Sequence, residues 1–137
     1  MKYAVRYYTR SGNTERLAKA IAEAVGAQAK SVDTDLEERV DVLLLACSYY
    51  AFDMDEAVKK FIEDNHQKIG EIVCFGTSAM MKSMKKPMQK LLEGYDIGLC
   101  NEEFHCRGEF WKFHIGHPNS DDLKNAAELA VKIVNKK

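Results

Sequence analysis

Residues 3–25 read YAVRYY-TRSGNT-ERLAKAIAEAV, and this stretch decides the fold. Its first part, Tyr3–Tyr8, is rich in apolar and aromatic residues and predicts a β-strand. Its last part, Glu15–Val25, places apolar residues at helical spacing and predicts an α-helix. The polar residues 9–14 lie between the two elements. A strand, a short polar loop and a helix in this order form the first half of a β-α-β unit.

The rest of the chain continues the alternation of strands and helices. Residues 40–47 are almost continuously apolar, which is typical of a central parallel strand that is covered on both faces. Further strands are expected at residues 27–32, 72–75 and 97–106, and Ser120 is the expected N-cap of the last helix. The later helices are predicted from three sets of apolar residues: Val58, Phe61 and Ile62; Met84, Met88, Leu91 and Leu92; and Leu123, Ala126, Ala127, Ala130, Val131 and Val134.

Five strands that alternate with four helices predict an α/β fold. We expect an open five-stranded parallel sheet in the order 2-1-3-4-5, with helices on both faces and residues 1–137 in a single domain. In such a sheet, ligands bind outside the carboxyl ends of the strands, where strands 1 and 3 diverge. Function is therefore expected in the loops that follow strands 1, 3 and 4.

The first of these loops is suited to a phosphate, because hydroxyl groups, backbone N–H groups and the positive end of a helix converge there. It consists of Thr9, Arg10, Ser11, Gly12, Asn13 and Thr14. Arg10 is the nearby cation. An ordinary polar turn with Asn13 or Thr14 as the helix N-cap is the alternative. The motif Thr-x-Ser-Gly-Asn-Thr after a first strand resembles the loop that binds the phosphate of FMN in flavodoxins. The resemblance implies the flavodoxin fold and non-covalently bound FMN.

Two later segments are similar to a short flavodoxin-like subfamily. Residues 104–110 resemble its Cys-x-Gly-Lys-like segment, with Glu109 in place of the lysine, and residues 116–123 contain its Gly-His-Pro-Asn turn. The chain between the fifth strand and the last helix is short, which argues against the long insertion that divides the fifth strand of long-chain flavodoxins.

The loops after strands 3 and 4 are the expected sites for the flavin ring. The third strand leads into a loop with three aromatic residues, which can stack on a planar ring: Ser48, Tyr49, Tyr50, Ala51, Phe52 and Asp53. Alternatively, Phe52 packs into the core. The loop after strand 4 offers small and hydroxyl-bearing residues to the pyrimidine edge, namely Thr77, Ser78 and Ala79. Met80 or Met81 can cover the second face of the ring.

Composition and charge give further expectations. The 137 residues are 46% hydrophobic and 30% charged, with a formal net charge of −1. No apolar run approaches the length of about 18 residues that a membrane span requires. Arg6 interrupts the apolar N-terminal segment, so we expect no signal peptide and a cytoplasmic protein. We expect neither nucleic acid nor a membrane as a partner.

The cysteines are expected to be reduced, buried thiols. Cys47, Cys74, Cys100 and Cys106 form no Cys-x-x-Cys motif. A zinc site built from Cys106, His114 and His117 is disfavoured, because their spacing lacks the paired ligands that structural zinc prefers. No metal site is therefore expected.

The resemblance implies single-electron transfer between redox partner proteins, and we favour such a carrier over an enzyme with its own substrate. An FMN-dependent NAD(P)H or quinone oxidoreductase is the main alternative, and an interaction module without flavin is another. A phosphorylated receiver domain is disfavoured, because the expected strand ends lack its acidic residues. The transient partners are expected to have mixed surface charge, because the predicted rim carries both signs: Asp53, Asp55 and Glu56, and Lys82, Lys85 and Lys86.

Overall fold

The computed structural model describes residues 2–8, 12–48, 56–77, 85–106 and 119–136. Its elements, in chain order, are β1 (Tyr3–Tyr8), α1 (Asn13–Val25), β2 (Ala29–Ser31), β3 (Val40–Ser48), α2 (Glu56–Asn65), the 3-10 helix η1 (His66–Lys68), β4 (Ile69–Thr77), α3 (Lys85–Leu91), β5 (Gly98–Leu99), β6 (Phe104–Cys106) and α4 (Ser120–Lys136).

The strands form one sheet in the order β2-β1-β3-β4-β5, and β6 also pairs with β4. Every paired strand runs parallel to its neighbour. The segments β5 and β6 follow the same edge of β4 and together take the place of the fifth strand. The predicted α/β fold with the order 2-1-3-4-5 is therefore confirmed.

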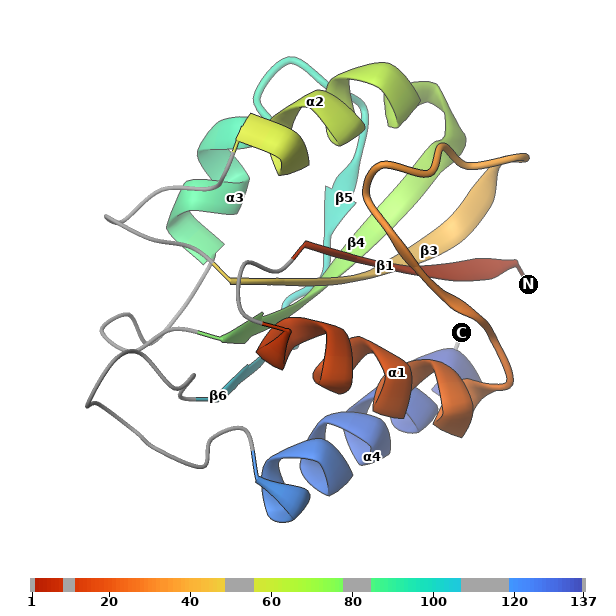
Figure 1. The fold of residues 1–137 in the computed structure, drawn as a ribbon. Helices are drawn as coiled ribbons and strands as arrows, with labels where there is room; N and C mark the ends of the chain where they lie inside the picture. The colour runs from red at the N-terminus through yellow and green to blue at the C-terminus, as the bar shows by residue number, and fades with distance from the viewer. Residues whose placement is uncertain (1, 9–11, 49–55, 78–84, 107–118, 137) are drawn as a thin grey trace.

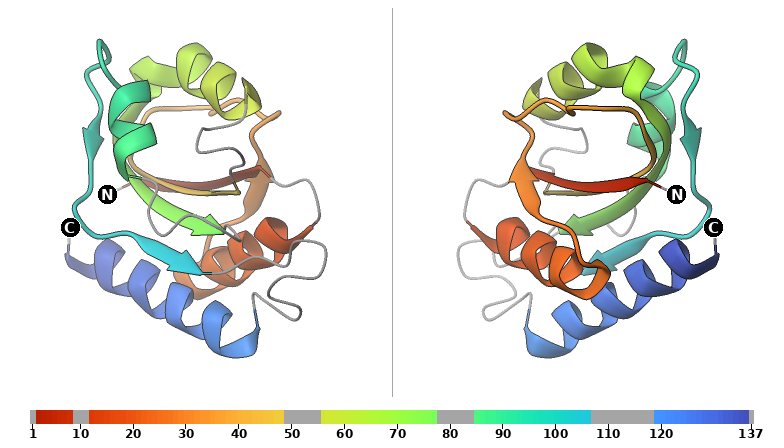
Figure 2. Two further views of the ribbon diagram at one scale, coloured as in Figure 1. Left: turned by 90° about the vertical axis from the view of Figure 1, so that its left-hand side faces the viewer. Right: turned by 90° about the vertical axis from the view of Figure 1, so that its right-hand side faces the viewer.

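The helices cover the sheet on both faces (Figure 1). Helices α1 and α4 lie on one face, and α2 and α3 lie on the other, as the two side views also show (Figure 2). Two buried clusters fill the layers, one under each pair of helices. Burial of each large aliphatic or aromatic side chain contributes about 1.5–3 kcal/mol.

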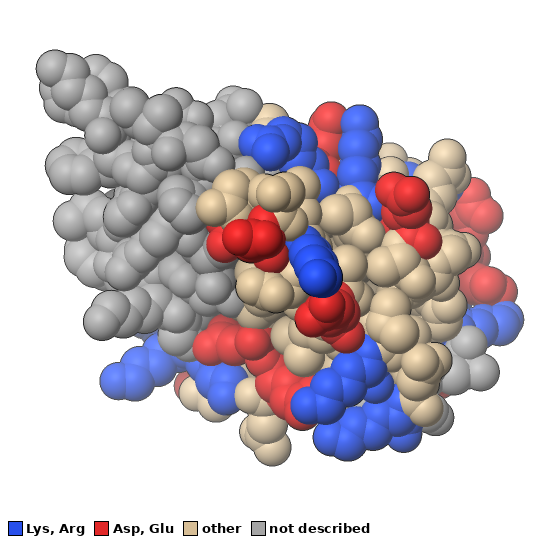
Figure 3. Space-filling view, turned by 90° about the horizontal axis from the view of Figure 1, so that it is seen from below, with Lys and Arg blue, Asp and Glu red and all other residues tan. Residues whose placement is uncertain are grey.

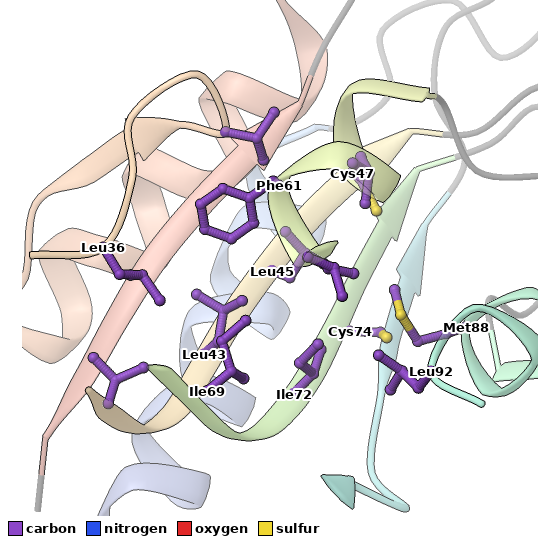
Figure 4. Packing of buried hydrophobic residues seen from close by; sticks show 14 residues of the cluster. Leu36, Leu43, Leu45, Cys47, Phe61, Ile69, Ile72, Cys74, Met88 and Leu92 are labelled. Carbon is purple, nitrogen blue, oxygen red and sulfur yellow. The ribbon is translucent and has the colours of Figure 1, made fainter. Parts of the chain in front are cut away.

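The central strand β3 supplies both clusters because its side chains alternate between the faces. Leu43 and Leu45 point toward α2 and α3, where they pack with Phe61 and Met88 (Figure 4). Leu44, between them, belongs to the cluster under α1 and α4. This explains why residues 40–47 read as an almost unbroken apolar run.

The crossover from β2 to β3 contains no helix and is held by buried polar side chains instead. Arg6, which is only 5% exposed, donates hydrogen bonds to the carbonyl oxygens of Val5, Thr34 and Asp35 at 3.0–3.2 Å. The amide of Asn65 accepts a hydrogen bond from the backbone N–H of Leu36 at 3.0 Å. These bonds compensate the desolvation of the crossover backbone, which lets Leu36 enter the core.

Strand β4 is longer than predicted, because two glycines hide its ends. The apolar pattern indicated residues 72–75, whereas the strand spans Ile69–Thr77 and pairs with β3 along that length. At Gly70, an added Cβ would lie 2.7 Å from the carbonyl oxygen of Asp41. A glycine therefore marks a close approach of two backbones here, and not the end of the strand.

The fifth strand is interrupted, which corrects the prediction of one strand over residues 97–106. Two residues of β4 separate Ile72 from Phe75, whereas four residues separate their partners Leu99 and Phe104 on the edge. The extra residues form a bulge. Glu102 in this bulge makes ion pairs with Lys132 at 3.4 Å and Lys136 at 3.5 Å. The edge of the sheet is thereby tied to the carboxyl end of α4.

The last helix begins at Ser120, so the N-cap is Asn119, one residue earlier than predicted. The side-chain oxygen of Asn119 accepts a hydrogen bond from the backbone N–H of Asp122, and the Asp122 carboxylate accepts one from the N–H of Asn119, both at 2.9 Å. This reciprocal pair is a capping box. The apolar stripe of α4 is centred on Ala126, Ala130 and Ile133, although the pattern had not included Ile133.

Candidate functional site

The parallel sheet brings the carboxyl ends of its strands together. Tyr8 of β1 lies beside Cys47 of β3. Ser48, the last residue of β3, lies beside Thr77 of β4, which in turn pairs with Cys106 of β6. The loops after strands 1, 3 and 4 therefore start from neighbouring positions at the carboxyl end of the sheet, as the sequence predicted.

The sheet also has a topological switch between β1 and β3. The chain leaves β1 for α1 on one face, and it leaves β3 for α2 on the other face (Figure 1). In open α/β sheets, the crevice between two strands whose connections diverge in this way is where ligands bind.

Gly12 forms the entry to α1 at this switch. It is the N-cap residue, and its backbone is left-handed, with φ 89° and ψ −10°. The first helical hydrogen bond runs from the N–H of Arg16 to the carbonyl oxygen of Gly12 at 3.2 Å. An added Cβ would meet no atom of the described residues within 4 Å, and the left-handed backbone conformation by itself favours glycine here. Neither Asn13 nor Thr14 is the N-cap, which corrects the alternative reading of this loop.

The first turn of α1 has features that fit an anion. Helix α1 is 13 residues long and follows β1 in the chain. Its positive amino end therefore lies at the switch point. A glycine N-cap has no side chain of its own to place over this end, and no atom of the described residues lies within 4 Å of its Cβ position. Thr14, in the same turn, is fully buried.

A polar network lies beside this turn. The Tyr7 hydroxyl donates a hydrogen bond to Glu15 Oε1 at 2.9 Å, and Lys19 Nζ lies 3.1 Å from Glu15 Oε2. Lys19 first, and then Tyr7, lower the pKa of Glu15, so the carboxylate is ionised at neutral pH. Tyr7, Glu15 and Lys19 were not among the predicted site residues. The i,i+4 spacing of Glu15 and Lys19 was a visible signal, but the contact with Tyr7 joins two elements.

The structure places only part of the predicted site. Gly12, Asn13 and Thr14 start α1 at the switch point, and the backbones of Ser48 and Thr77 end neighbouring strands. The other predicted cofactor-binding residues lie outside the described residues: Thr9, Arg10, Ser11, Tyr49, Tyr50, Ala51, Phe52, Asp53, Ser78, Ala79 and Met80.

Cys47, Cys74 and Cys100 are not joined in disulfides. Cys47 and Cys74 are buried, as predicted, and Cys100 is half-buried. Burial raises the pKa of Cys74 to about 12 and that of Cys47 well above its ordinary value, so both are protonated at neutral pH. Of the residues considered for zinc, His114 and His117 lie outside the described part of the chain. Within the described ranges, no three His, Cys, Asp or Glu side chains are grouped so as to hold a metal ion.

No helix that the structure describes combines the length and apolar character needed to cross a membrane.

The chain resembles known proteins in both structure and sequence. A flavodoxin from the domain Archaea superposes with a TM-score of 0.76 at 18% identity, covering 99% of this chain and 98% of that one. A short-chain flavodoxin associated with a non-canonical PDU bacterial microcompartment gives a TM-score of 0.70 at 17% identity, covering 99% of both chains. No protein-family model matches the sequence.

These likenesses show the fold: the chain has the flavodoxin-like fold. Its sequence is 30% identical over 135 residues to the uncharacterized protein MJ0298 of Methanocaldococcus jannaschii, a match that covers 89% of this chain and 90% of the relative. The chain belongs to the same family as that archaeal protein.

Proposed function

We propose that this protein binds FMN without a covalent bond and carries single electrons between redox partner proteins. The observation that carries the proposal is Gly12, a left-handed N-cap at the start of α1 and at the switch point of the sheet. The motif around Gly12 and the flavodoxin-like fold both favour FMN over other phosphate-bearing ligands.

The residues that hold FMN in this proposal come from three loops. Residues 9–14 bind the phosphate through hydroxyl and N–H groups, with Arg10 as the cation. Residues 48–53 and 77–80 flank the flavin ring. Bound FMN supplies one-electron chemistry, and the chain orients the ring and shields it from water. The described turn fits this role, because it offers the positive end of a helix that begins at a glycine with no side chain.

The proposed partners have mixed surface charge and bind weakly. Near the carboxyl end of the sheet, exposed Glu56 begins α2, whereas exposed Lys86 lies in the first turn of α3. On the face formed by α1 and α4, basic and acidic side chains are also interspersed (Figure 3). No single sign dominates these surfaces, so we expect electron transfer to depend only modestly on salt. A steep fall in the rate with added salt would contradict this part of the proposal.

The first test is whether the purified protein is yellow and releases FMN on acid treatment. Protein without cofactor is then titrated with FMN, and the loss of flavin fluorescence is followed. We expect saturable binding of one FMN per chain. A colourless protein that takes up no FMN would contradict the proposed function.

A second assay separates the carrier from the alternative enzyme. The FMN-loaded protein is mixed with NADH or NADPH, with and without a quinone, and oxidation of the nicotinamide is recorded. A carrier gives no sustained turnover without a partner reductase. Rapid turnover by the protein alone would instead establish an FMN-dependent NAD(P)H or quinone oxidoreductase.

A further inference from the structure

We propose that Tyr7 and Lys19 are positioning residues: they hold the Glu15 carboxylate so that it does not compete with the phosphate of FMN at the amino end of α1. This inference rests on the proposed function and adds residues outside the loop motif to it. It explains why an acidic residue stands in the first turn of a helix that is proposed to receive a dianion.

Glu15 occupies the third helical position after the N-cap Gly12. An acidic or amide side chain at this position commonly folds back and accepts a hydrogen bond from the N–H of the N-cap residue. In that conformation the Glu15 carboxylate would occupy the place proposed for the phosphate. It would also put a second negative charge next to a dianion.

The described contacts show that Glu15 takes a different conformation. One carboxylate oxygen accepts the hydrogen bond from Tyr7, and the other faces Lys19. Tyr7 is half-buried on β1 and packs against the cluster under α1, so its hydroxyl is fixed by the sheet. Lys19 lies one turn further along the same helix. In these contacts the carboxylate faces Tyr7 and Lys19, and not the N–H of Gly12.

Helix α4, on the same face of the sheet, has an acidic residue that does fold back onto its N-cap. In α4, the acidic residue at the third position, Asp122, folds back onto the N–H of Asn119 at 2.9 Å. Asn119 completes the box by accepting from the N–H of Asp122. The acidic residues of α1 and α4 thus occupy equivalent positions but have different partners.

A purely structural role for the network is the competing explanation, because the same contacts also join β1 to α1. The two roles differ in what they affect. A structural clasp changes thermal stability and alters FMN and riboflavin binding alike. A positioning role changes the affinity for FMN, but not that for riboflavin, which has no phosphate.

The test compares Tyr7→Phe and Lys19→Gln with matched controls. Tyr3→Phe also removes a hydroxyl from β1, one that donates to the carbonyl oxygen of Val25 at the far end of α1 at 2.6 Å. Lys60→Gln removes an i,i+4 ion pair with Asp64 on α2. Because like charges at close range repel, we expect Tyr7→Phe and Lys19→Gln each to weaken FMN binding about three- to tenfold. Both controls should bind FMN like the wild type.

A double-mutant cycle identifies Glu15 as the cause. Glu15→Ala removes the carboxylate that the two residues hold, and it should bind FMN at least as tightly as the wild type. In the Glu15→Ala background, Tyr7→Phe and Lys19→Gln should no longer weaken FMN binding.

The outcomes separate this inference from the proposed function. Wild-type protein that binds FMN, together with Tyr7 and Lys19 variants that bind like their controls, overturns the positioning role alone. A loss of FMN affinity that persists in the Glu15→Ala background also overturns the positioning role. An equal loss of affinity for riboflavin does the same. Wild-type protein that binds no FMN overturns the proposed function, and the positioning role with it.

Discussion

Helices α1 and α4 lie on the same face of the sheet, but their first turns are capped differently. Helix α4 closes its first turn with its own side chains, through the reciprocal hydrogen bonds of Asn119 and Asp122. Helix α1 begins at a left-handed glycine, and its acidic residue Glu15 contacts Tyr7 and Lys19 instead. A closed helix end stabilises the fold. At α1 the N-cap residue itself provides no side-chain cap, at the point where the topology of the sheet predicts a ligand.

The largest effect is expected from Gly12→Ala. The substitution forces a side chain into a conformation with φ 89°, and this should shift the first turn of α1 and weaken FMN binding by about tenfold or more. The strain itself should cost about 1–2 kcal/mol in the free energy of unfolding. FMN titration and chemical denaturation measure the two effects separately.

Gly94→Ala is the matched control, because Gly94 also has φ 89° and open space beyond its Cβ position. It lies in the turn after α3, at the other end of the sheet. It should lose a similar amount of stability and keep its affinity for FMN. Equal losses of affinity in both variants would show that general destabilisation, and not the geometry at Gly12, governs binding.

Asn119→Ala should have the converse effect. Removing the N-cap of α4 leaves the N–H of Asp122 without its side-chain acceptor and should cost about 1 kcal/mol of stability. The affinity for FMN should stay unchanged, as measured by the same titration. A marked loss of FMN binding would mean that both helix ends contribute to the site, which removes the contrast between them.

The smallest effect is expected at the carboxyl end of α4, where Glu102 contacts Lys132 and Lys136. These lysines lower the pKa of Glu102, so the ion pairs add stability above the ordinary pKa of a glutamate. That contribution is lost as the pH falls through the lowered pKa. Glu102→Gln should therefore reduce stability slightly at pH 7, and the difference from wild type should shrink toward pH 3. A difference that is constant with pH would contradict the ionic role.

Much of the fold could be predicted from the sequence because burial determines the pattern. The run at residues 40–47 is apolar because both faces of β3 are covered. The ends of the strands and helices were predicted less accurately. Gly70 concealed the start of β4, and the bulge around Glu102 leaves no distinct signal in an alternating segment. Both Asn119 and Ser120 are good N-caps, so sequence alone did not choose between them.

At the expected site, the conformation of Gly12 and the positions of the strand ends were predictable from local sequence and topology. Gly12 has the left-handed conformation that a glycine in a phosphate loop permits, and the strand ends meet where the predicted topology puts them. The contact between Tyr7 and Glu15 was not predictable, because it joins a strand to a helix and depends on how α1 packs on β1. The aromatic loop at residues 49–53 lies outside the described residues, and its role stays a prediction.

The most direct test of the account follows the backbone amides of both helix ends by NMR while FMN is added. If the amino end of α1 receives the phosphate, the amides of Gly12, Asn13 and Thr14 shift with FMN and with inorganic phosphate, whereas those of Asn119 and Ser120 do not shift with phosphate. Phosphate-induced shifts at α4, or no shift at the start of α1 when FMN binds, would contradict the claim that the amino end of α1 receives the phosphate.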